Sequence, residues 1–440
     1  MRRFLLAISA LITAVCLIPV RAQAAPRLQD TGEKLVIVID PGHGGENLGT
    51  IEGKQVEKYM TMVTALAMYQ ELMLYEGVEV YLTHTLDVDM DLEERAEFAA
   101  SVGADFLFSV HYNASGNHEL FGSEVWVSVQ PPYNGYGYQF GYEFLSDMNE
   151  KGLFVRGVKA RPGTRGDYYG IIRHSVERNI PAVIIEHCHV DEARDAVFCD
   201  DDEKLKAFGR ADATAAARYF GLKSSVLGVD YSDFPLAEAR TDANVEATVR
   251  DETAPDYCRI EFVGADYDRG VITIKASAAD SDSMLLYYSY SIDGGITFQR
   301  REVWPGCDVL EGVCPDTVTL EIPKLSGMKP QIVLRVYNMY DLYTDSNCYV
   351  SQETFPVLSA DDGLKGRPEE EDLNIIPVDA KAAEPGAKGF DPEVLLKICL
   401  VSAVIMGALI FASQLITYAD RRRWRLQCRK EAGRSKNQQR

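Results

Sequence analysis

Several kinds of residue pattern are missing from this sequence, and each absence excludes a class of function. No two cysteines stand in CxxC spacing, so a zinc ribbon is unsupported. No glycine-rich nucleotide-binding loop and no internal repeat occurs. Basic residues are in deficit, because 45 Lys and Arg stand against 66 Asp and Glu and give a net charge of −21. Such an acidic surface repels phosphate backbones, which excludes nucleic acid as a partner.

The N-terminus has the pattern of an export signal. A basic start, Met1-Arg2-Arg3, precedes an apolar run from Phe4 to Val20, and Ala22-Gln23-Ala24 offers small residues for cleavage. This order predicts a signal peptide over residues 1–24. An uncleaved N-terminal anchor is the alternative, because the apolar run is long for a signal.

The other end has the pattern of a membrane anchor. Residues 394–418 are predicted to form a transmembrane helix, and the stretch Ile398–Tyr418 within it carries no formal charge. The basic tail, residues 419–440, contains an arginine cluster that belongs on the cytoplasmic side. The preceding residues 356–393 are rich in proline and acidic residues, which predicts a linker. We therefore expect a single-pass protein of the cell membrane, with the bulk of the chain extracytoplasmic.

Residues 34–221 alternate short apolar runs with amphipathic stretches, which predicts an α/β domain. Helices are expected over residues 56–75 and from Asp91, where Glu94 completes a capping pattern. The tyrosine-rich residues 131–142 contain turn residues and predict a loop, which could stack on sugar rings or simply be exposed. Strands are expected over Leu35–Ile39, Val78–Leu82, Phe106–Val110, Val125–Val129 and Ala182–Ile185.

A predicted linker over residues 222–253 leads to a segment of different character. Residues 254–355 alternate apolar and polar side chains between glycine-containing turns, which predicts an all-β, immunoglobulin-like sandwich. Two cysteine pairs could bridge it, Cys258 with Cys348 and Cys307 with Cys314, and the sequence leaves the connectivity open.

Three of the predicted strands in the α/β domain lead into a polar residue that a core would not select. These residues are His43, His111 and Glu186. Ligands gather at the carboxyl edge of the strands in open α/β sheets, so all three are expected at one edge. Glu57 falls in the first turn of the helix after the glycine loop and can reach the same edge.

These four residues suffice for metal-assisted amide hydrolysis. Two histidines and a carboxylate are three protein ligands that leave zinc a fourth position for water. Zinc lowers the pKa of that water and polarises a carbonyl, and a second carboxylate can carry the proton to the leaving nitrogen. Each histidine taken alone is more often structural than ligating, so the prediction rests on the convergence of four positions.

Four separated blocks of the sequence carry a family resemblance. They are IVIDPGHGG, VEKYMTM, LEERAEFAASVGADFLFSVHYNAS and IIRHSVERNIPAVIIEHCHV. In this order they resemble the motifs of the zinc-dependent N-acetylmuramoyl-L-alanine amidases, over about residues 34–221. The resemblance implies a mixed-sheet α/β fold and cleavage of the amide between N-acetylmuramic acid and L-alanine in peptidoglycan. It also implies that His43, Glu57 and His111 bind Zn²⁺ and that Glu186 is the catalytic carboxylate.

The sequence departs from this family after the catalytic glutamate, where a glycine and an aromatic residue usually follow. Here the segment His187-Cys188-His189 stands instead; it could retune the site, support a ligand from outside or only pack differently. Cys188 is not expected to be a nucleophile, because its neighbours already form a metal site. Arg173 and Asn113 are the candidates for substrate binding, and Arg173 could equally be a surface residue.

The predictions combine into a membrane-anchored, extracytoplasmic peptidoglycan amidase with Zn²⁺ as cofactor and a possible wall or protein partner for the β-domain. Two alternatives stay open: a non-catalytic scaffold or sensor that binds peptidoglycan, and a zinc peptidase that cuts within the stem peptide. Because all four candidate site residues precede Gly221, the sequence also predicts that the chemistry does not need the β-domain.

Overall fold

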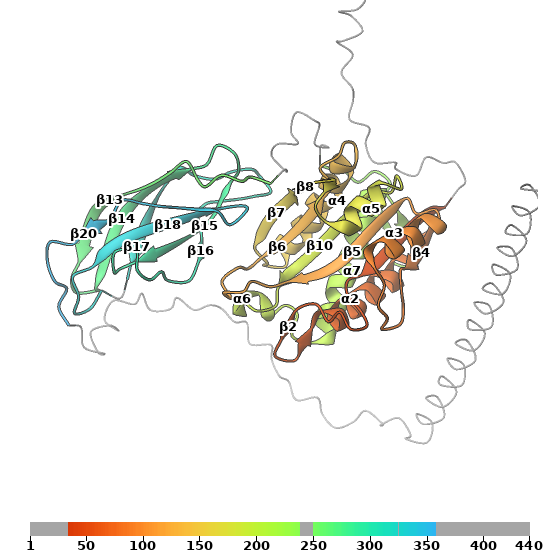
Figure 1. Cartoon of the computed structure of the whole chain (residues 1–440), viewed down its shortest axis with the longest axis horizontal. Coiled ribbons are helices and arrows are strands. Elements are labelled where there is room, and N and C mark those ends of the chain that lie inside the picture. Colours follow the sequence, from red (N-terminus) through yellow and green to blue (C-terminus); the bar gives the residue numbers. More distant parts are fainter. Residues whose placement is uncertain (1–33, 238–249, 324, 358–440) are drawn as a thin grey trace, which may run out of the picture. The chain divides into compact units, whose positions relative to one another are not determined.

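A computed structural model of the chain describes residues 34–237, 250–323 and 325–357, which belong to one compact unit. They comprise an α/β domain (residues 34–237) and a β-domain (residues 250–357), shown in Figure 1. No helix within these ranges is long and apolar enough to cross a membrane. The predicted signal peptide, the transmembrane helix over residues 394–418 and the basic tail all lie outside the described residues.

A six-stranded sheet forms the centre of the α/β domain. Its strands are β1 (Leu35–Pro41), β4 (Val78–Leu82), β5 (Phe106–Asn113), β6 (Ser123–Val127), β7 (Val155–Ala160) and β10 (Ala182–His189). They lie in the order β4-β1-β5-β10-β6-β7. Neighbours are parallel except β10 and β6, which pair antiparallel. The predicted mixed-sheet α/β fold is therefore confirmed, and β1, β5 and β10 share one carboxyl edge.

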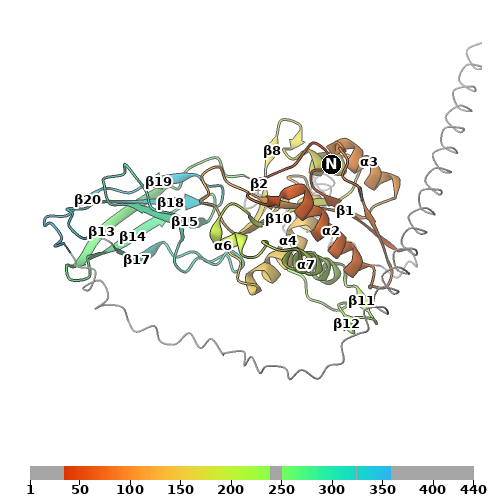
Figure 2. The ribbon, with the colours of Figure 1, turned by 90° about the horizontal axis from the view of Figure 1, so that it is seen from below.

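Helices cover both faces of this sheet (Figures 1 and 2). One apolar core joins the sheet to α2 (Glu57–Leu72), α4 (Tyr133–Glu150) and α7 (Asp202–Phe220). A second core on the opposite face joins it to α3 (Leu92–Ser101) and α5 (Gly170–Val176). Asp91 and Glu94 form the expected capping box at the start of α3. Short elements complete the domain: β2 (Ile51–Glu52), β3 (Gln55–Val56), β8 (Pro162–Gly163), β9 (Gly166–Asp167), α6 (Ala193–Ala196), β11 (Lys223–Ser224) and β12 (Val229–Asp230).

The predicted loop over residues 131–142 is wrong, because α4 begins at Tyr133. Its glycines are not turn signals but points of close helix–sheet approach. A Cβ at Gly137 would lie 2.7 Å from Val127 Cγ1, and one at Gly141 would lie 2.8 Å from Val158 Cγ2. Glycine therefore lets this helix sit closer to the sheet than any other residue would allow.

The predicted linker over residues 222–253 is wrong for its first part. Residues 223–230 form the two-stranded β11–β12 sheet. Leu227, Val229, Tyr231 and Leu236 pack against the core of the α/β domain. Burial of these side chains attaches the segment to the domain instead of leaving it free.

The β-domain consists of two antiparallel sheets around one apolar core that includes the buried Trp304. The strands are β13 (Tyr257–Asp266), β14 (Val271–Ala279), β15 (Leu285–Ser291), β16 (Glu302–Val303), β17 (Thr317–Ile322), β18 (Gln331–Asn338), β19 (Tyr343–Asp345) and β20 (Tyr349–Val350). One sheet has the order β13-β14-β17, and the other has the order β16-β15-β18-β19, with β20 paired to β18. The six described cysteines have free thiols, and those of Cys307 and Cys314 both lie against the carbonyl oxygen of Leu285.

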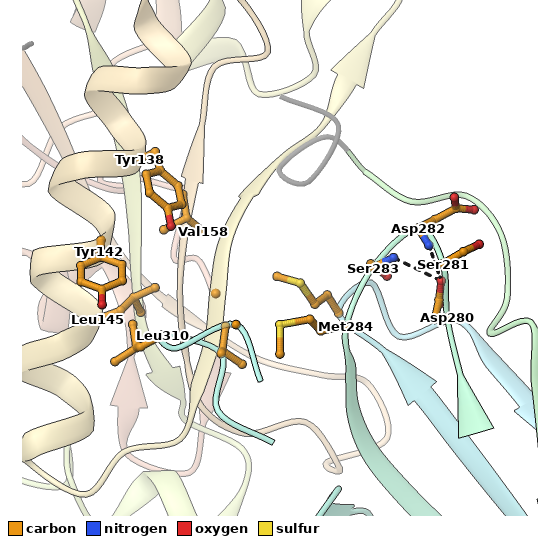
Figure 3. Close-up of a pocket in the computed structure, with 14 residues that line it drawn as sticks. Tyr138, Tyr142, Leu145, Val158, Asp280, Ser281, Asp282, Ser283, Met284 and Leu310 are labelled. Carbon is orange, nitrogen blue, oxygen red and sulfur yellow. Dashed lines mark hydrogen bonds between the residues drawn. The ribbon is translucent and has the colours of Figure 1, made fainter. Parts of the chain in front are cut away.

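The two domains pack together beside β7, the edge strand of the α/β sheet. Phe121 of the α/β domain joins buried residues of β15 and β18 in one apolar cluster. A Cβ at Gly157 in β7 would lie 2.5 Å from Met339 Cε, so glycine permits this close contact. Figure 3 shows a pocket of about 310 Å³ at the same junction, with Tyr138 and Tyr142 of α4 on one side and residues 280–283 on the other.

Candidate metal centre and catalytic site

The structure brings the three predicted metal ligands together. His43 Nε2 and His111 Nδ1 each lie 3.0 Å from Glu57 Oε1. One ligand atom from each of the three residues lies within 4.8 Å of the other two. His43 follows β1, His111 lies in β5 and Glu57 opens α2, so the carboxyl edge of the sheet meets a helix N-terminus here.

The loop between β1 and α2 orients His43 through its backbone and through glycine. His43 itself has a left-handed backbone, with φ of 68°. Its Nδ1 lies 3.0 Å from Asn47 Oδ1, which leaves Nε2 directed at Glu57. A Cβ at Gly42 would lie 2.5 Å from the His111 ring, and one at Gly49 would lie 2.5 Å from Glu57 Oε2. The His111 ring and the Glu57 carboxyl group therefore occupy the space that a side chain at position 42 or 49 would need.

A buried ion pair between Arg95 and Asp40 holds the start of the same loop. Arg95 Nη1 donates to Asp40 Oδ1 and to the Pro41 carbonyl oxygen, each at 2.7 Å. Arg95 Nη2 donates to the His43 carbonyl oxygen at 2.7 Å. Both charged side chains are almost fully buried, so the guanidinium group holds the end of β1 and the histidine in one geometry.

The three side chains hold Glu57 as an anion between two imidazoles. Burial opposes ionisation of Glu57, but hydrogen bonds from His111 and His43 outweigh it and hold the pKa of Glu57 well below its usual range. Burial lowers the pKa of His43, but the hydrogen bond and the charge of Glu57, with the hydrogen bond to Asn47, together outweigh burial and leave that pKa raised. Two imidazoles and a carboxylate are a donor set that binds zinc, so the residues present fit this metal.

Glu186 has a free oxygen at the edge of this centre. It lies in β10, in register with His111 of β5 on one side and Glu124 of β6 on the other. Its Oε2 is buried and has no hydrogen-bond partner among the described residues. Burial first, and then the charges of Glu57 and Glu124, raise the pKa of Glu186 well above its ordinary value. A carboxyl group with this environment is suited to carrying a proton.

Its neighbour Glu124 is fully engaged with protein groups. Lys159 Nζ at 2.7 Å and Arg156 Nε at 2.8 Å donate to its Oε2. Asn113 Nδ2 at 2.9 Å donates to its Oε1. Burial opposes its ionisation, but Lys159 and Arg156 outweigh burial and hold the pKa of Glu124 well below its usual range. The two carboxylates therefore differ, one being fixed as a structural anion and the other being available for proton transfer.

The other predicted residues take different positions. Asn113 lines the pocket beside Glu186. Arg173 donates to the carbonyl oxygens of Asp167 and Tyr168, at 3.0 and 3.3 Å, which supports a nearby loop. His187 is fully buried, with Nε2 3.0 Å from Asp212 Oδ1 and Nδ1 3.0 Å from the His111 carbonyl oxygen. The His187 side chain therefore packs against the backbone of β5, the strand that carries His111.

The sequence did not predict that Glu124, Arg156 and Lys159 would lie beside Glu186. The charges of Arg156 and Lys159, with Gly157 between them, break the apolar run that would have predicted β7. A usable signal was present, since two cations in an otherwise apolar stretch require a buried anion. The sequence could not say which of its many acidic residues supplies that anion.

Comparison with known proteins gives consistent matches. A family described as N-acetylmuramoyl-L-alanine amidase matches residues 37–218. The chain is 31% identical over 212 residues to the N-acetylmuramoyl-L-alanine amidase CwlM of Bacillus licheniformis, across 48% of this chain and 78% of the relative. It is 30% identical over 190 residues to the sporulation-specific N-acetylmuramoyl-L-alanine amidase of Bacillus subtilis (strain 168), across 43% and 69%. The solved catalytic domain of CwlV from Bacillus (Paenibacillus) polymyxa var. colistinus is 25% identical, across 43% of this chain and 99% of that chain, with a TM-score of 0.38.

Proposed function

Because the chain belongs to the N-acetylmuramoyl-L-alanine amidase family and therefore acts on peptidoglycan, we propose that it is a zinc enzyme in which Glu186 carries the proton. The observation that supports this proposal is the convergence of His43, Glu57 and His111 beside a carboxyl group, one oxygen of which has no hydrogen-bond partner among the described residues. The bond cut is the amide between N-acetylmuramic acid and L-alanine.

His43, Glu57 and His111 would hold the metal. A zinc ion bound there supplies a water of lowered pKa and polarises the substrate carbonyl. Asn47 and Arg95 fix the orientation of His43, and the Thr50 backbone N–H donates to Glu57 Oε2 at 2.8 Å, which leaves Oε1 facing both histidines. The chain's part in this step is to hold three donors in place without rearrangement.

Glu186 would accept the proton of the attacking water at a carboxylate oxygen and deliver it to the leaving nitrogen of L-alanine. A bound cation favours the ionised form of a nearby carboxyl group, so the metal would offset the raised pKa that burial gives Glu186. Glu124 does not compete for this role, because its oxygens accept from Lys159, Arg156 and Asn113.

The proposal includes export and anchoring. The basic and apolar start, the uncharged stretch Ile398–Tyr418 and the arginines behind it support a signal peptide and a C-terminal membrane helix. A relative, LytH of Staphylococcus aureus, is described as a probable cell wall amidase, which agrees with action outside the cytoplasm. Protease added to spheroplasts should leave a short protected C-terminal fragment. Digestion of the tail from outside would refute this topology.

We assign the β-domain, which has two antiparallel sheets around one core, to the immunoglobulin-like class.

The activity is tested with the purified full chain, by metal analysis and by mass analysis of digested peptidoglycan. We expect about one zinc per chain and free lactyl ends on the glycan. Cuts inside the stem peptide would identify a zinc peptidase instead. A zinc-loaded chain that binds peptidoglycan and releases nothing would identify a scaffold.

A further inference from the structure

A pocket of about 260 Å³ is lined by Glu186 together with residues of both domains. On the side of the α/β domain it is lined by residues such as Asn113 and Trp126. The β-domain contributes Tyr340 and Asp341, in the turn between β18 and β19, and Arg250, which is its first described residue. The pocket that contains the catalytic carboxyl group is therefore made by both domains.

The β-domain wall is fixed by a buried charge network. Arg156, only 2% exposed, donates from Nε to Glu124, from Nη1 to Tyr287 Oη at 2.9 Å and from Nη2 to Asp341 Oδ2 at 2.8 Å. Asp341 also accepts from Arg301 Nη1 at 2.8 Å. One guanidinium group thus joins the neighbour of the catalytic carboxyl group to two residues of the β-domain.

Aromatic rings line the same pocket. The Trp126 ring lies 5.0 Å from the Tyr169 ring and 6.4 Å from the Tyr340 ring, measured between centroids. Lys159 Nζ lies 5.7 Å from the Trp126 centroid and 5.6 Å from the Tyr340 centroid. The aromatic surface therefore continues from the α/β domain onto the β-domain turn, around a buried cation.

The pocket carries an excess of positive charge. Arg156 and Lys159 are compensated by Glu124 and Asp341. Arg161 and Arg250 also line the pocket, and neither forms an ion pair with a carboxylate in the described part of the chain. Arg161 lies over the Tyr168 ring, at 3.5 Å from the centroid. Two guanidinium groups that have no carboxylate partner among the described residues favour a carboxylate on the ligand that fills the pocket.

We infer that the β-domain completes the substrate pocket of the amidase, with Tyr340 and Arg250 as specificity-determining residues that hold a carboxylate-bearing part of the stem peptide. The inference rests on the proposed function, since Glu186 places the scissile amide at one end of the pocket. An anion that extends from that amide must belong to the substrate's own peptide. This inference replaces the expectation from sequence that the chemistry is independent of the β-domain.

The test uses the full chain and two soluble muropeptides, one with free stem-peptide carboxylates and one with those groups amidated. Arg250→Gln should raise KM about tenfold on the free form, with little change in kcat, and should leave the amidated form unaffected, because only the free form has the charge to lose. Tyr340→Ala should raise KM on both forms, and Tyr340→Phe should restore it. Tyr343→Ala, an exposed tyrosine of the neighbouring strand, is the matched control.

Zinc content and thermal unfolding are measured on every variant, so that a folding defect is separated from a pocket defect. Wild-type KM values on both substrates for folded, zinc-loaded Arg250→Gln and Tyr340→Ala would overturn the inference. If the wild-type chain hydrolyses neither substrate, the proposed function fails, and equilibrium binding of the same two muropeptides then decides the inference. Weaker binding by both variants supports it, and unchanged binding refutes it.

Discussion

Gly49 and Gly53 stand in the loop before α2 with similar left-handed backbones, at φ of +66° and +56°. Their surroundings differ. A Cβ at Gly49 would lie 2.5 Å from Glu57 Oε2 and 2.6 Å from His43 Cδ2, whereas one at Gly53 would meet nothing within 4 Å. Backbone conformation alone explains Gly53, while the close approach of two proposed metal ligands, Glu57 and His43, also requires glycine at position 49.

This contrast gives a prediction with a built-in control. Gly53→Ala should lose about 1–2 kcal/mol of stability, the cost of a left-handed alanine, and Gly49→Ala should lose at least as much. Only Gly49→Ala should also lose zinc affinity and turnover, because its new methyl group displaces Glu57 and His43. Urea unfolding and metal content, measured on the same preparations, check both parts. Equal zinc retention in the two variants would contradict the prediction.

A second residue-scale prediction separates the roles of the two glutamates. Glu57→Ala should lose zinc and activity together, because two histidines alone bind the metal weakly. Glu186→Gln should keep its zinc and lose turnover by about 10²–10⁴-fold, because glutamine cannot accept a proton at neutral pH. The exposed Glu52→Gln, on β2, should behave as wild type. Near-normal turnover of Glu186→Gln would disprove its assignment as the proton carrier.

At the scale of elements, the position of Glu57 depends on how closely α2 packs on α7. Gly209 of α7 lies against α2, where a Cβ would come 2.2 Å from the Thr64 carbonyl oxygen and 2.8 Å from the Ala67 Cβ. The nearest atom is backbone, so a side chain at this position cannot be accommodated by rotation. The two helices approach as closely as they do because the contact residue has no Cβ.

Gly209→Ala should therefore destabilise the chain by about 1–3 kcal/mol through overpacking. The sign of this stability change is informative, because alanine in a helix is otherwise more favourable than glycine by about 1 kcal/mol. Turnover should also fall, since a shift of α2 moves Glu57 at its first residue. The adjacent exposed Arg210→Ala should change stability by less than about 0.5 kcal/mol. Thermal unfolding that shows Gly209→Ala to be stabilising would refute the proposed contact.

At the scale of the whole molecule, buried charges join the two domains. Burial opposes ionisation of Asp341, but Arg156, Lys159 and Arg301 outweigh it and lower the pKa of Asp341 below its ordinary value of 3.8. A carboxyl group whose pKa is lower in the folded state stabilises the fold above its ordinary pKa and loses that contribution as the pH falls. Acid should therefore weaken the junction between the domains.

The wild-type melting temperature should accordingly fall more steeply between about pH 5 and pH 3 than that of Asp341→Asn, which has no proton to take up at this site. At neutral pH the variant should be the less stable of the two, because Arg156 then lacks one of its anions. Asp345→Asn, an exposed position on β19, serves as the control and should follow the wild-type slope. Parallel pH profiles for wild type and Asp341→Asn would show that this ion pair does not stabilise the junction.

The sequence by itself determined which residues would meet at the candidate site. His43 follows β1, and His111 and Glu186 follow the apolar runs within β5 and β10. Parallel strands bring their carboxyl ends to one edge, so linear order was enough to group these residues. The capping box of α3 could likewise be predicted, because Asp91 and Glu94 are three residues apart and depend on no distant partner.

Only the tertiary structure decided the features that depend on distant partners. The glycines of α4 look like turn residues until the sheet beneath them is known, and the cations of β7 look exposed until Glu124 and Asp341 are placed beside them. A buried charge or a missing Cβ is favourable only in the presence of a specific neighbour. For Arg156 one such neighbour lies 185 residues away, in a domain that the sequence alone separated from the chemistry.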